Sequence, residues 1–256
     1  MGGIDWGQLW LARERRGRVT IDPKLDPVLK MLEYFAPNSH GTILEVGAGT
    51  GLRTMHFAKR HRLKAAYLDL SVDVLGLIAR REQEIRFRGR KVQGDARHMP
   101  FESGSFDIVW SADLCEHFVG PERQTVFDEM VRVCKKGGRV IVIVPNSYNI
   151  PYCLTKAFKS LFGGWPYGIE KPFTPAELVA RMRAAGLRNV KMYGIGALLA
   201  HYRWFFHDTS LAGKLLRNPT GIPLLNRVLI RADLAMGPNK HFNNFFGREI
   251  GAVGIK

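Results

Sequence analysis

Cysteine is scarce in this 256-residue chain, and its three copies are scattered. Cys115, Cys134 and Cys153 form no Cys-x-x-Cys pair, and no histidine cluster stands near them at the spacing of a zinc site. An odd number of separated thiols is typical of reduced, structural cysteines. We therefore expect no disulfide framework, no structural zinc and no other metal site.

Long hydrophobic runs are also missing. The strictly apolar stretch VIVIV at 140–144 is far too short to cross a bilayer. The N-terminal segment MGGIDWGQLWLARERRG contains Asp5 and Glu14 and lacks the apolar core of a signal peptide. No internal repeat or low-complexity tract interrupts the chain. These absences predict a cytoplasmic globular protein.

Acidic residues are too few to balance the basic ones. The chain has 38 Lys and Arg against 23 Asp and Glu, which gives a formal charge of +15. Such a field attracts nucleic acids, anionic lipid headgroups or acidic substrates. A solvated basic surface would give the same number, because net charge concerns association and not the fold or the reaction.

What the sequence does contain is a regular alternation of short apolar runs and amphipathic stretches, which predicts an α/β fold with a parallel sheet and crossover helices. Residues 1–38 are interpreted as a helical arm, 39–256 as the main domain, and 197–247 as a substrate-side cap inserted before the last strand. Strands are predicted at 42–47, 63–70, 90–95, 106–113, 139–146, 189–196 and 248–256, and helices at 51–61, from 71 onward, 123–134 and 175–186.

The strongest local motif is ILEVGAGTG at 43–51, where a buried strand ends in Glu45 and glycines follow at alternate positions. Glycines at such a turn allow a ligand to approach the main chain closely. A dinucleotide fingerprint would need a glycine at Leu52, and a phosphate-binding P-loop would need Gly-Lys-Ser/Thr. Both patterns are absent, so the motif indicates a different ligand.

Two further acids follow the next two strands. Asp69 ends the second strand in YLDLS, where a carboxylate can reach the two hydroxyls of a ribose. Asp95 ends the third strand in GDARHMP, at the same edge of the sheet. Either aspartate alone could be a helix N-cap. Three acids at three successive strand ends instead predict one binding site.

Five segments in chain order complete this pattern: LEVGAGTG, YLDLS, GDARHMPFESGSFDIVWSADLCEHF, RVCKKGGRVIVIVPN and FTPAELVARMRAAG. Together they resemble the class I S-adenosylmethionine (SAM)-dependent methyltransferases, and most of all the type-11 group that includes quinone-biosynthesis O-methyltransferases. The resemblance runs from about residue 40 to 196. It implies a Rossmann-like, seven-stranded, mostly parallel sheet with helices on both faces, and SAM as cofactor with S-adenosylhomocysteine as product.

The resemblance also implies roles for individual residues. The methionine end of SAM would lie against Glu45 and the glycine loop, the ribose against Asp69, and the adenine against Leu70, Asp95 and Ala96. Ser111 and Ala112, at the end of the fourth strand, would line the methionine part. The implied cofactor-binding residues are Glu45, Gly47, Ala48, Gly49, Gly51, Asp69, Leu70, Asp95, Ala96, Ser111 and Ala112.

Candidates for catalysis follow the fourth strand in DLCEHF. Asp113, Glu116 and His117 would face the same crevice, and His117 could accept a proton from an acceptor hydroxyl. Alternatively, Glu116 and His117 only anchor the following helix. Methyl transfer from a sulfonium is an in-line displacement, so alignment in a dry pocket supplies much of the rate without a base.

Three hypotheses remain open for the acceptor. A small or lipid-like molecule is favoured by the family resemblance and by the aromatic segments 147–152 and 201–206, which could wall its pocket. The basic amphipathic stretch 222–237 could add a peripheral membrane contact, or simply pack as a cap helix. RNA or protein is favoured by the charge and by the arginine-rich run 80–91. An inactive SAM-binding scaffold is disfavoured by the intact glycine loop.

Overall fold

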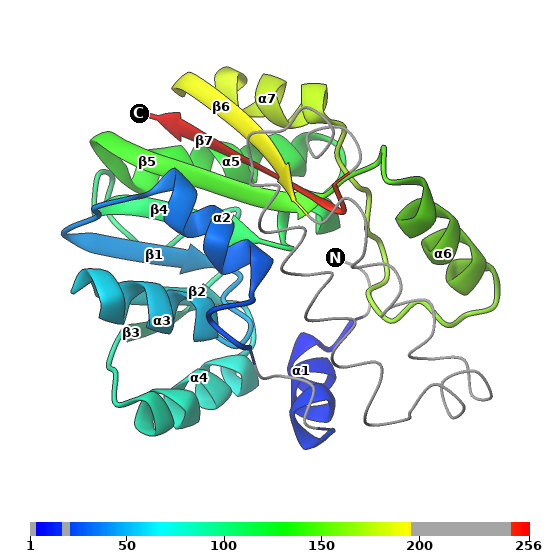
Figure 1. The fold of residues 1–256 in the computed structure, drawn as a ribbon, viewed down its shortest axis with the longest axis horizontal. Coiled ribbons are helices and arrows are strands. Elements are labelled where there is room, and N and C mark those ends of the chain that lie inside the picture. The colour runs from blue at the N-terminus through cyan, green and yellow to red at the C-terminus, as the bar shows by residue number, and fades with distance from the viewer. Residues whose placement is uncertain (1–3, 17–20, 196–246) are drawn as a thin grey trace.

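A computed structural model describes residues 4–16, 21–195 and 247–256 of the chain (Figure 1). Its centre is a seven-stranded sheet in the order β3-β2-β1-β4-β5-β7-β6. The strands are β1 Thr42–Val46, β2 Lys64–Asp69, β3 Arg90–Gln93, β4 Phe106–Ala112, β5 Cys134–Pro145, β6 Arg188–Ile195 and β7 Glu249–Ile255. Only β7 runs antiparallel to its neighbours β5 and β6. The predicted Rossmann-like α/β fold is confirmed.

Helices cover both faces of this sheet. Side chains alternate along each strand, so Leu44 and Val46 of β1 pack on one face while Ile43 packs on the other. The first face is covered by α5 and α7, and the second by α2, α3 and α4. The helices are α1 Trp6–Arg15, α2 Pro27–Phe35, α3 Leu52–His61, α4 Val72–Ile85, α5 Pro121–Val133, α6 Ile150–Leu161 and α7 Pro175–Ala184, with a short 3₁₀ helix, η1, at Cys115–His117.

Several helices begin where the sequence carries a capping side chain. The Ser71 hydroxyl accepts a hydrogen bond from the Val74 amide and so starts α4 where a helix was predicted from 71 onward. Thr174 caps α7 in the same way through the Glu177 amide at 3.0 Å, with proline in the first turn. These caps fix the entry of the chain into each crossover helix.

Two elements differ from the prediction. The fifth strand was predicted at 139–146, after a helix at 123–134, but β5 already starts at Cys134. The C-terminal residue extends the ladder there, because the Gly137 amide donates to the Lys256 carbonyl at 2.9 Å and the Lys256 amide donates to Gly138 at 3.1 Å. Helix α6 was not predicted; Asn149 starts it by accepting a hydrogen bond from the Tyr152 amide at 2.9 Å.

The N-terminal arm contains two helices. Helix α2 lies in the core, since Val28, Leu32 and Phe35 are buried between the sheet and α3. Helix α1 contacts α4, where Arg81 forms an ion pair with Glu14 at 2.5 Å. The predicted cap insertion 197–247 and the stretches 201–206 and 222–237 lie outside the described residues, apart from Gly247. No helix in the described ranges is long and apolar enough to cross a bilayer.

Candidate functional site

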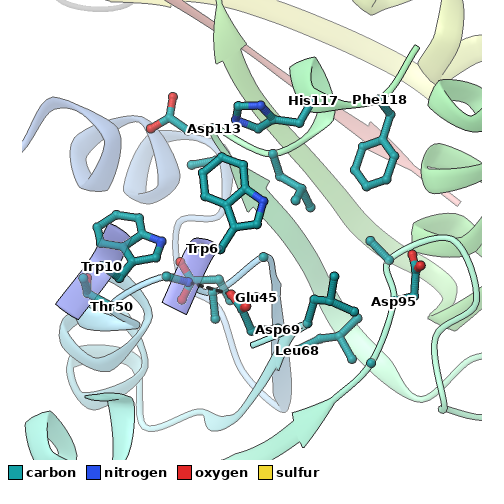
Figure 2. Close-up of a pocket in the computed structure, with 18 of the residues that line it drawn as sticks. Trp6, Trp10, Glu45, Thr50, Leu68, Asp69, Asp95, Asp113, His117 and Phe118 are labelled. Carbon is teal, nitrogen blue, oxygen red and sulfur yellow. Dashed lines mark hydrogen bonds between the residues drawn. The ribbon is translucent and has the colours of Figure 1, made fainter. Parts of the chain in front are cut away.

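The candidate site lies where the strand order reverses, at the carboxyl ends of β1, β2 and β4. Loops leaving these strands turn to opposite faces of the sheet, and this leaves a crevice between β1 and β4. One pocket occupies it (Figure 2). The pocket is lined by Trp6, Trp10, Glu45, Gly47, Ala48, Gly49, Thr50, Arg53, Leu68, Asp69, Leu70, Gly94, Asp95, Ala96, Ala112, Asp113, Leu114, His117 and Phe118.

The glycine loop forms the floor of this pocket. The Gly47 and Ala48 amides both donate to the Leu68 carbonyl, at 2.8 and 3.1 Å, which holds the loop against the end of β2. Gly47 and Gly49 have φ values of +67° and +51°, a region that side chains disfavour. A Cβ on Gly49 would also stand 3.0 Å from the Trp10 ring. The loop therefore needs glycine both for its turn and for its close contact with α1.

Glu45 is a buried carboxyl group at the end of β1. Its side chain accepts a hydrogen bond from Thr54, whose hydroxyl in turn accepts the Trp110 indole N–H at 2.8 Å. The other oxygen, Oε2, has no hydrogen-bond partner among the described residues. Burial raises the pKa of Glu45 to about 8, against partial opposition from Thr54 and Arg53. A buried, unpaired carboxyl oxygen in a pocket is suited to an incoming cation or hydrogen-bond donor.

Arg53, one turn into α3, brings a positive charge to the same pocket. Its Nε donates to both carboxylate oxygens of Asp26, at 3.1 and 3.3 Å. Asp26 also caps α2 through the Leu29 amide at 2.7 Å. Asp26, at the start of α2, thus holds the Arg53 guanidinium through its Nε atom. The pocket therefore offers a carboxyl group and a guanidinium near each other, a pairing suited to an amino-acid zwitterion.

Asp69 connects the end of β2 to the glycine loop. One of its oxygens accepts the Gly49 amide at 3.2 Å, and the other accepts the Ser71 amide at 3.0 Å. The N-cap of α4 is Ser71 and not Asp69, so Asp69 is not the helix cap. Burial raises the pKa of Asp69, while these amide hydrogen bonds oppose the rise. The carboxylate lies on the pocket lining, where a ligand diol can reach it.

Asp95 lies on the pocket lining and is held by a neighbouring arginine. Arg97 donates from Nε and Nη2 to the Asp95 carboxylate, at 2.6 to 3.1 Å, and also binds Glu122 at 2.5 Å. The guanidinium keeps the pKa of Asp95 below its usual value. Asp95 is therefore an ionised acceptor whose orientation is fixed from outside the pocket.

The remaining implied cofactor residues fall into two groups. Leu70, Ala96 and Ala112 line the pocket with the residues above. Ser111 is buried, and its hydroxyl points at Cys115 Sγ, 3.7 Å away, and at the Met130 sulfur. Gly51 is the N-cap of α3. Ser111 and Gly51 thus support the site from positions that are not on the lining.

The catalytic candidates lie in η1 and just before it. Asp113, with φ of +55°, and His117 both line the pocket, while Glu116 is 1% exposed next to them. The His117 Nδ1–H donates to the Ile169 carbonyl at 2.9 Å, which leaves Nε2 as the acceptor of the neutral ring. Burial lowers the pKa of His117. The ring is therefore neutral at physiological pH and able to accept a proton.

Glu116 has a different environment from His117. Its carboxyl is buried, and Asp113, Glu170 and Glu249 are all close enough to raise its pKa further. Its Oε1 lies 3.9 Å from His117 Nε2. Burial and these neighbouring carboxyl groups all raise the pKa of Glu116 and favour its neutral form, so Glu116 is better suited to shaping the pocket wall than to supplying a fixed negative charge.

Trp6 and Trp10 of α1 are pocket residues that the sequence analysis missed. They stand one helical turn apart and therefore point from the same face of α1 into the pocket (Figure 2). Trp6 meets the His117 ring with centroids 4.7 Å apart. The signal in the sequence was this i, i+4 pair of tryptophans, but nothing in it places α1 over the glycine loop.

The described residues contain no group of three or more His, Cys, Asp or Glu side chains that could hold a metal ion. The pocket instead fits SAM. Its unpaired Glu45 oxygen and Arg53 guanidinium suit the methionyl ammonium and carboxylate, its glycine loop admits close approach, and Asp69 suits the ribose diol.

Comparison with known proteins agrees with this geometry. The family described as "Methyltransferase domain", of the type-11 group, matches residues 44–142. A phosphatidylethanolamine N-methyltransferase from Cereibacter sphaeroides is 36% identical over 105 residues, which are 40% of this chain and 50% of that protein. The ubiquinone/menaquinone biosynthesis C-methyltransferase UbiE of Rhizobium johnstonii is 30% identical over 138 residues, 52% of this chain and 51% of that protein.

The solved structures include the phosphoethanolamine N-methyltransferase 2 of Haemonchus contortus in complex with SAM, with a TM-score of 0.65 at 18% identity. That comparison covers 100% of this chain and 60% of the other, and at this identity it shows the fold alone. The chain spans about half the length of these two curated relatives. Residues 44–142 thus match a methyltransferase domain of the type-11 group, and they lie within a seven-stranded Rossmann-like sheet.

Proposed function

We propose that this protein is an enzyme that transfers a methyl group from SAM to a small-molecule or lipid-like acceptor. The observation that carries the proposal is the pocket at the β1–β4 crevice, in which Glu45, Arg53 and Asp69 meet the glycine loop. When bound, SAM supplies a methyl group activated on a sulfonium. The chain's own residues then bind the cofactor, orient it and exclude water.

Each part of the pocket has its own role in this proposal. Glu45 and Arg53 hold the two charged ends of the methionine part, and Gly47 and Gly49 let it lie against the main chain. Asp69 accepts hydrogen bonds from the ribose hydroxyls. Leu70, Asp95 and Ala96 surround the adenine, and Ala112 lines the methionine part, with Ser111 buried behind it.

The acceptor side of the pocket lies toward η1. His117 lines the pocket as a neutral ring whose unprotonated nitrogen is Nε2, so it can take the proton that an acceptor hydroxyl, ammonium or acidic carbon loses. Asp113 lines the same wall and stabilises the imidazolium that this transfer forms. Trp6 closes the pocket over both groups and helps to keep water from the displacement.

The acceptor class is supported by the relatives. The names of the matched proteins mention phosphatidylethanolamine in one case and the biosynthesis of ubiquinone or menaquinone in the other. All three compounds are lipids or lipid-like molecules. RNA or protein methylation, and a SAM-binding scaffold without turnover, remain alternative outcomes of the experiment. We place the enzyme in the cytoplasm, at the surface of a membrane when its acceptor is a lipid.

The test is transfer of a radiolabelled methyl group from SAM into a host extract that is then separated into lipid, small-molecule, RNA and protein fractions. Label in the lipid or small-molecule fraction supports the proposal, with the Asp69→Ala variant as the blank. Label in RNA or protein would show that the acceptor is RNA or protein and would refute the proposed acceptor class. SAM binding without label in any fraction would make the protein a scaffold.

A further inference from the structure

Helix α6 has polar side chains on its inner side and apolar side chains on its exposed side, the reverse of an ordinary surface helix. Its inner side is marked by Tyr152, which is buried and donates a hydrogen bond to Glu170. Lys156 lies on this inner side too, and burial lowers its pKa. Polar groups thus lie on the inner side of α6, and the helix itself stands apart from the sheet (Figure 1).

The outward side of α6 is apolar. Its large side chains recur at intervals of three and four residues, so they form one continuous helical face. We define the α6 apolar face as Ile150, Leu154, Phe158, Leu161 and Phe162, which are 63%, 65%, 64%, 78% and 69% exposed. Five large apolar side chains gathered on one exposed helix mark an interaction surface, because isolated exposed apolar residues are the usual case.

The charges around this face are positive. Between 150 and 171 the basic residues are Lys156, Lys159 and Lys171, and Glu170 is the single acid. Glu170 lies largely inside the protein, and burial raises its pKa to about 8, so it is mostly protonated at neutral pH. An apolar face with basic neighbours is the pattern of a helix that lies in the interface of an anionic membrane.

We propose that the α6 apolar face docks the protein on an anionic phospholipid bilayer, with α6 lying in the plane of the interface. Both forces favour this occupant, because the bilayer takes up the apolar side chains and its negative surface attracts Lys159 and Lys171, whereas Lys156 lies on the inner side. A second copy of this chain would bring the same charge of +15 to the contact and would be repelled. The described helices do not span a bilayer, which fits a surface contact.

The docking face is linked to the pocket by the segment that follows α6. In this segment the Ile169 carbonyl accepts the His117 hydrogen bond, and the Tyr167 ring lies 5.7 Å from the Arg13 guanidinium of α1. A Cβ at Gly168 would collide with Ile4, so the segment also packs closely on the chain before α1. Docking through α6 would therefore bring the acceptor wall of the pocket near the lipid headgroups. This last step rests on the proposed function, but the docking itself does not.

The experiment measures co-sedimentation of the full chain with vesicles, in the absence of SAM. Vesicles of phosphatidylcholine alone are compared with an equal mixture of phosphatidylcholine and phosphatidylglycerol. We expect binding to the anionic vesicles that weakens as salt is raised. The double variant Leu154→Ser/Phe158→Ser should reduce the partition coefficient by about tenfold or more, because two inserting side chains are lost.

Val72→Ser is the matched control, since Val72 is 62% exposed at the start of α4, away from the α6 apolar face. It should bind vesicles like the wild type. Absence of vesicle binding by the wild type, or equal binding by the double variant, would overturn the proposal. A fall in melting temperature of the double variant without vesicle binding would also overturn it and would show that residues of this chain cover the face. A dimer that the double variant loses would overturn it in favour of a second copy.

Because binding is measured without cofactor or turnover, this result is independent of the methyl-transfer assay. Vesicle binding with no methyl transfer would leave the docking surface standing and remove the proposed function. Methyl transfer with no vesicle binding would leave the proposed function standing and remove the docking surface. The two proposals therefore fail separately.

Discussion

The edge of the Trp6 indole meets the His117 imidazole with ring centroids 4.7 Å apart and planes inclined by 66°. This contact joins α1, at the start of the chain, to η1 beyond the fourth strand, across the mouth of the pocket. Trp10 lies one turn further along the same helix face, against the glycine loop. Helix α1 is thus a wall of the cofactor pocket and also orients the proposed base.

The first prediction concerns this wall. Trp6→Ala should lower kcat/KM by about tenfold, because the edge contact holds the imidazole and the indole excludes water; such ring pairs contribute about 0.5–1.5 kcal/mol. Trp6→Phe keeps an aromatic edge and should retain most of the activity. Steady-state kinetics of the two variants decide the matter, and equal activity of Trp6→Ala and wild type would show that α1 is a passive cover.

A second prediction follows from the buried carboxyl of Glu45. With a pKa of about 8 this group is largely protonated at pH 7, and binding the methionyl ammonium should ionise it. SAM binding at pH 7 should therefore release close to one proton. Calorimetry in buffers of different ionisation enthalpy measures this number, and Glu45→Gln should abolish the release. If the wild type released no proton, Glu45 would not be the group that binds the methionyl ammonium.

The raised pKa of Glu45 also makes the stability of the ligand-free protein depend on pH. Its ordinary pKa is 4.5, so between pH 4.5 and about 8 the folded protein keeps a proton that the unfolded chain has lost. The free energy of unfolding of the wild type should therefore fall, relative to Glu45→Gln, as the pH rises through this window. Urea unfolding of both proteins at several pH values tests the sign, and parallel curves would show an unshifted carboxyl.

The sequence predicted the sheet well because its signals are local. Buried strands such as 42–46 are continuous apolar runs, and Ser71 or Thr174 marks a helix start within a few residues. The acids at Glu45, Asp69 and Asp95 also follow from position alone, since the ends of parallel strands share one edge.

What the sequence did not predict depends on contacts between distant segments. Nothing local places Trp6 over residues forty or more positions away, or turns Arg53 toward the pocket by a bond to Asp26. Helix α6 was missed for another reason. Its apolar side faces outward, and the segment around Tyr152 was interpreted as a pocket wall.

Asp69 provides the test of the ribose site. Asp69→Ala should weaken SAM binding by about 1–2 kcal/mol, because charge-assisted hydrogen bonds to the ribose are lost. The variant also frees the Gly49 amide, so loop order contributes to the loss. Asp73→Ala, at an exposed site in the first turn of α4, is the control and should bind normally. Unchanged affinity of Asp69→Ala by calorimetry would refute the ribose assignment.

Arg123 should matter for folding rather than for binding. The guanidinium is buried, donates to the Phe118 and Lys171 carbonyls at 2.8 and 2.6 Å, and pairs with Glu177 at 3.0 Å. Arg123→Ala should lower the free energy of unfolding by about 1–3 kcal/mol, since the Phe118 and Lys171 carbonyls lose this donor, while Glu177 keeps its ion pair with Arg181. The exposed Arg183→Ala is the control for chemical denaturation. Similar stability of both variants would mean that water replaces the guanidinium.

The final prediction concerns His117 as a base. Burial holds its pKa below the ordinary value of 6.5, so the ring is already neutral at pH 7. With an acceptor that must lose a proton, kcat/KM should rise with pH on the acidic side and level off below pH 6.5. His117→Ala should cut turnover by about a hundredfold or more while SAM affinity stays nearly unchanged.

The exposed His40→Ala is the control and should keep both the rate and the pH profile. Rates and affinities come from methyl-transfer kinetics and calorimetry on the same preparations. If His117→Ala kept full activity, alignment alone would account for the displacement and His117 would be a wall residue. If turnover and SAM affinity fell together, the imidazole would act by holding Trp6 and the pocket closed, and not by taking a proton.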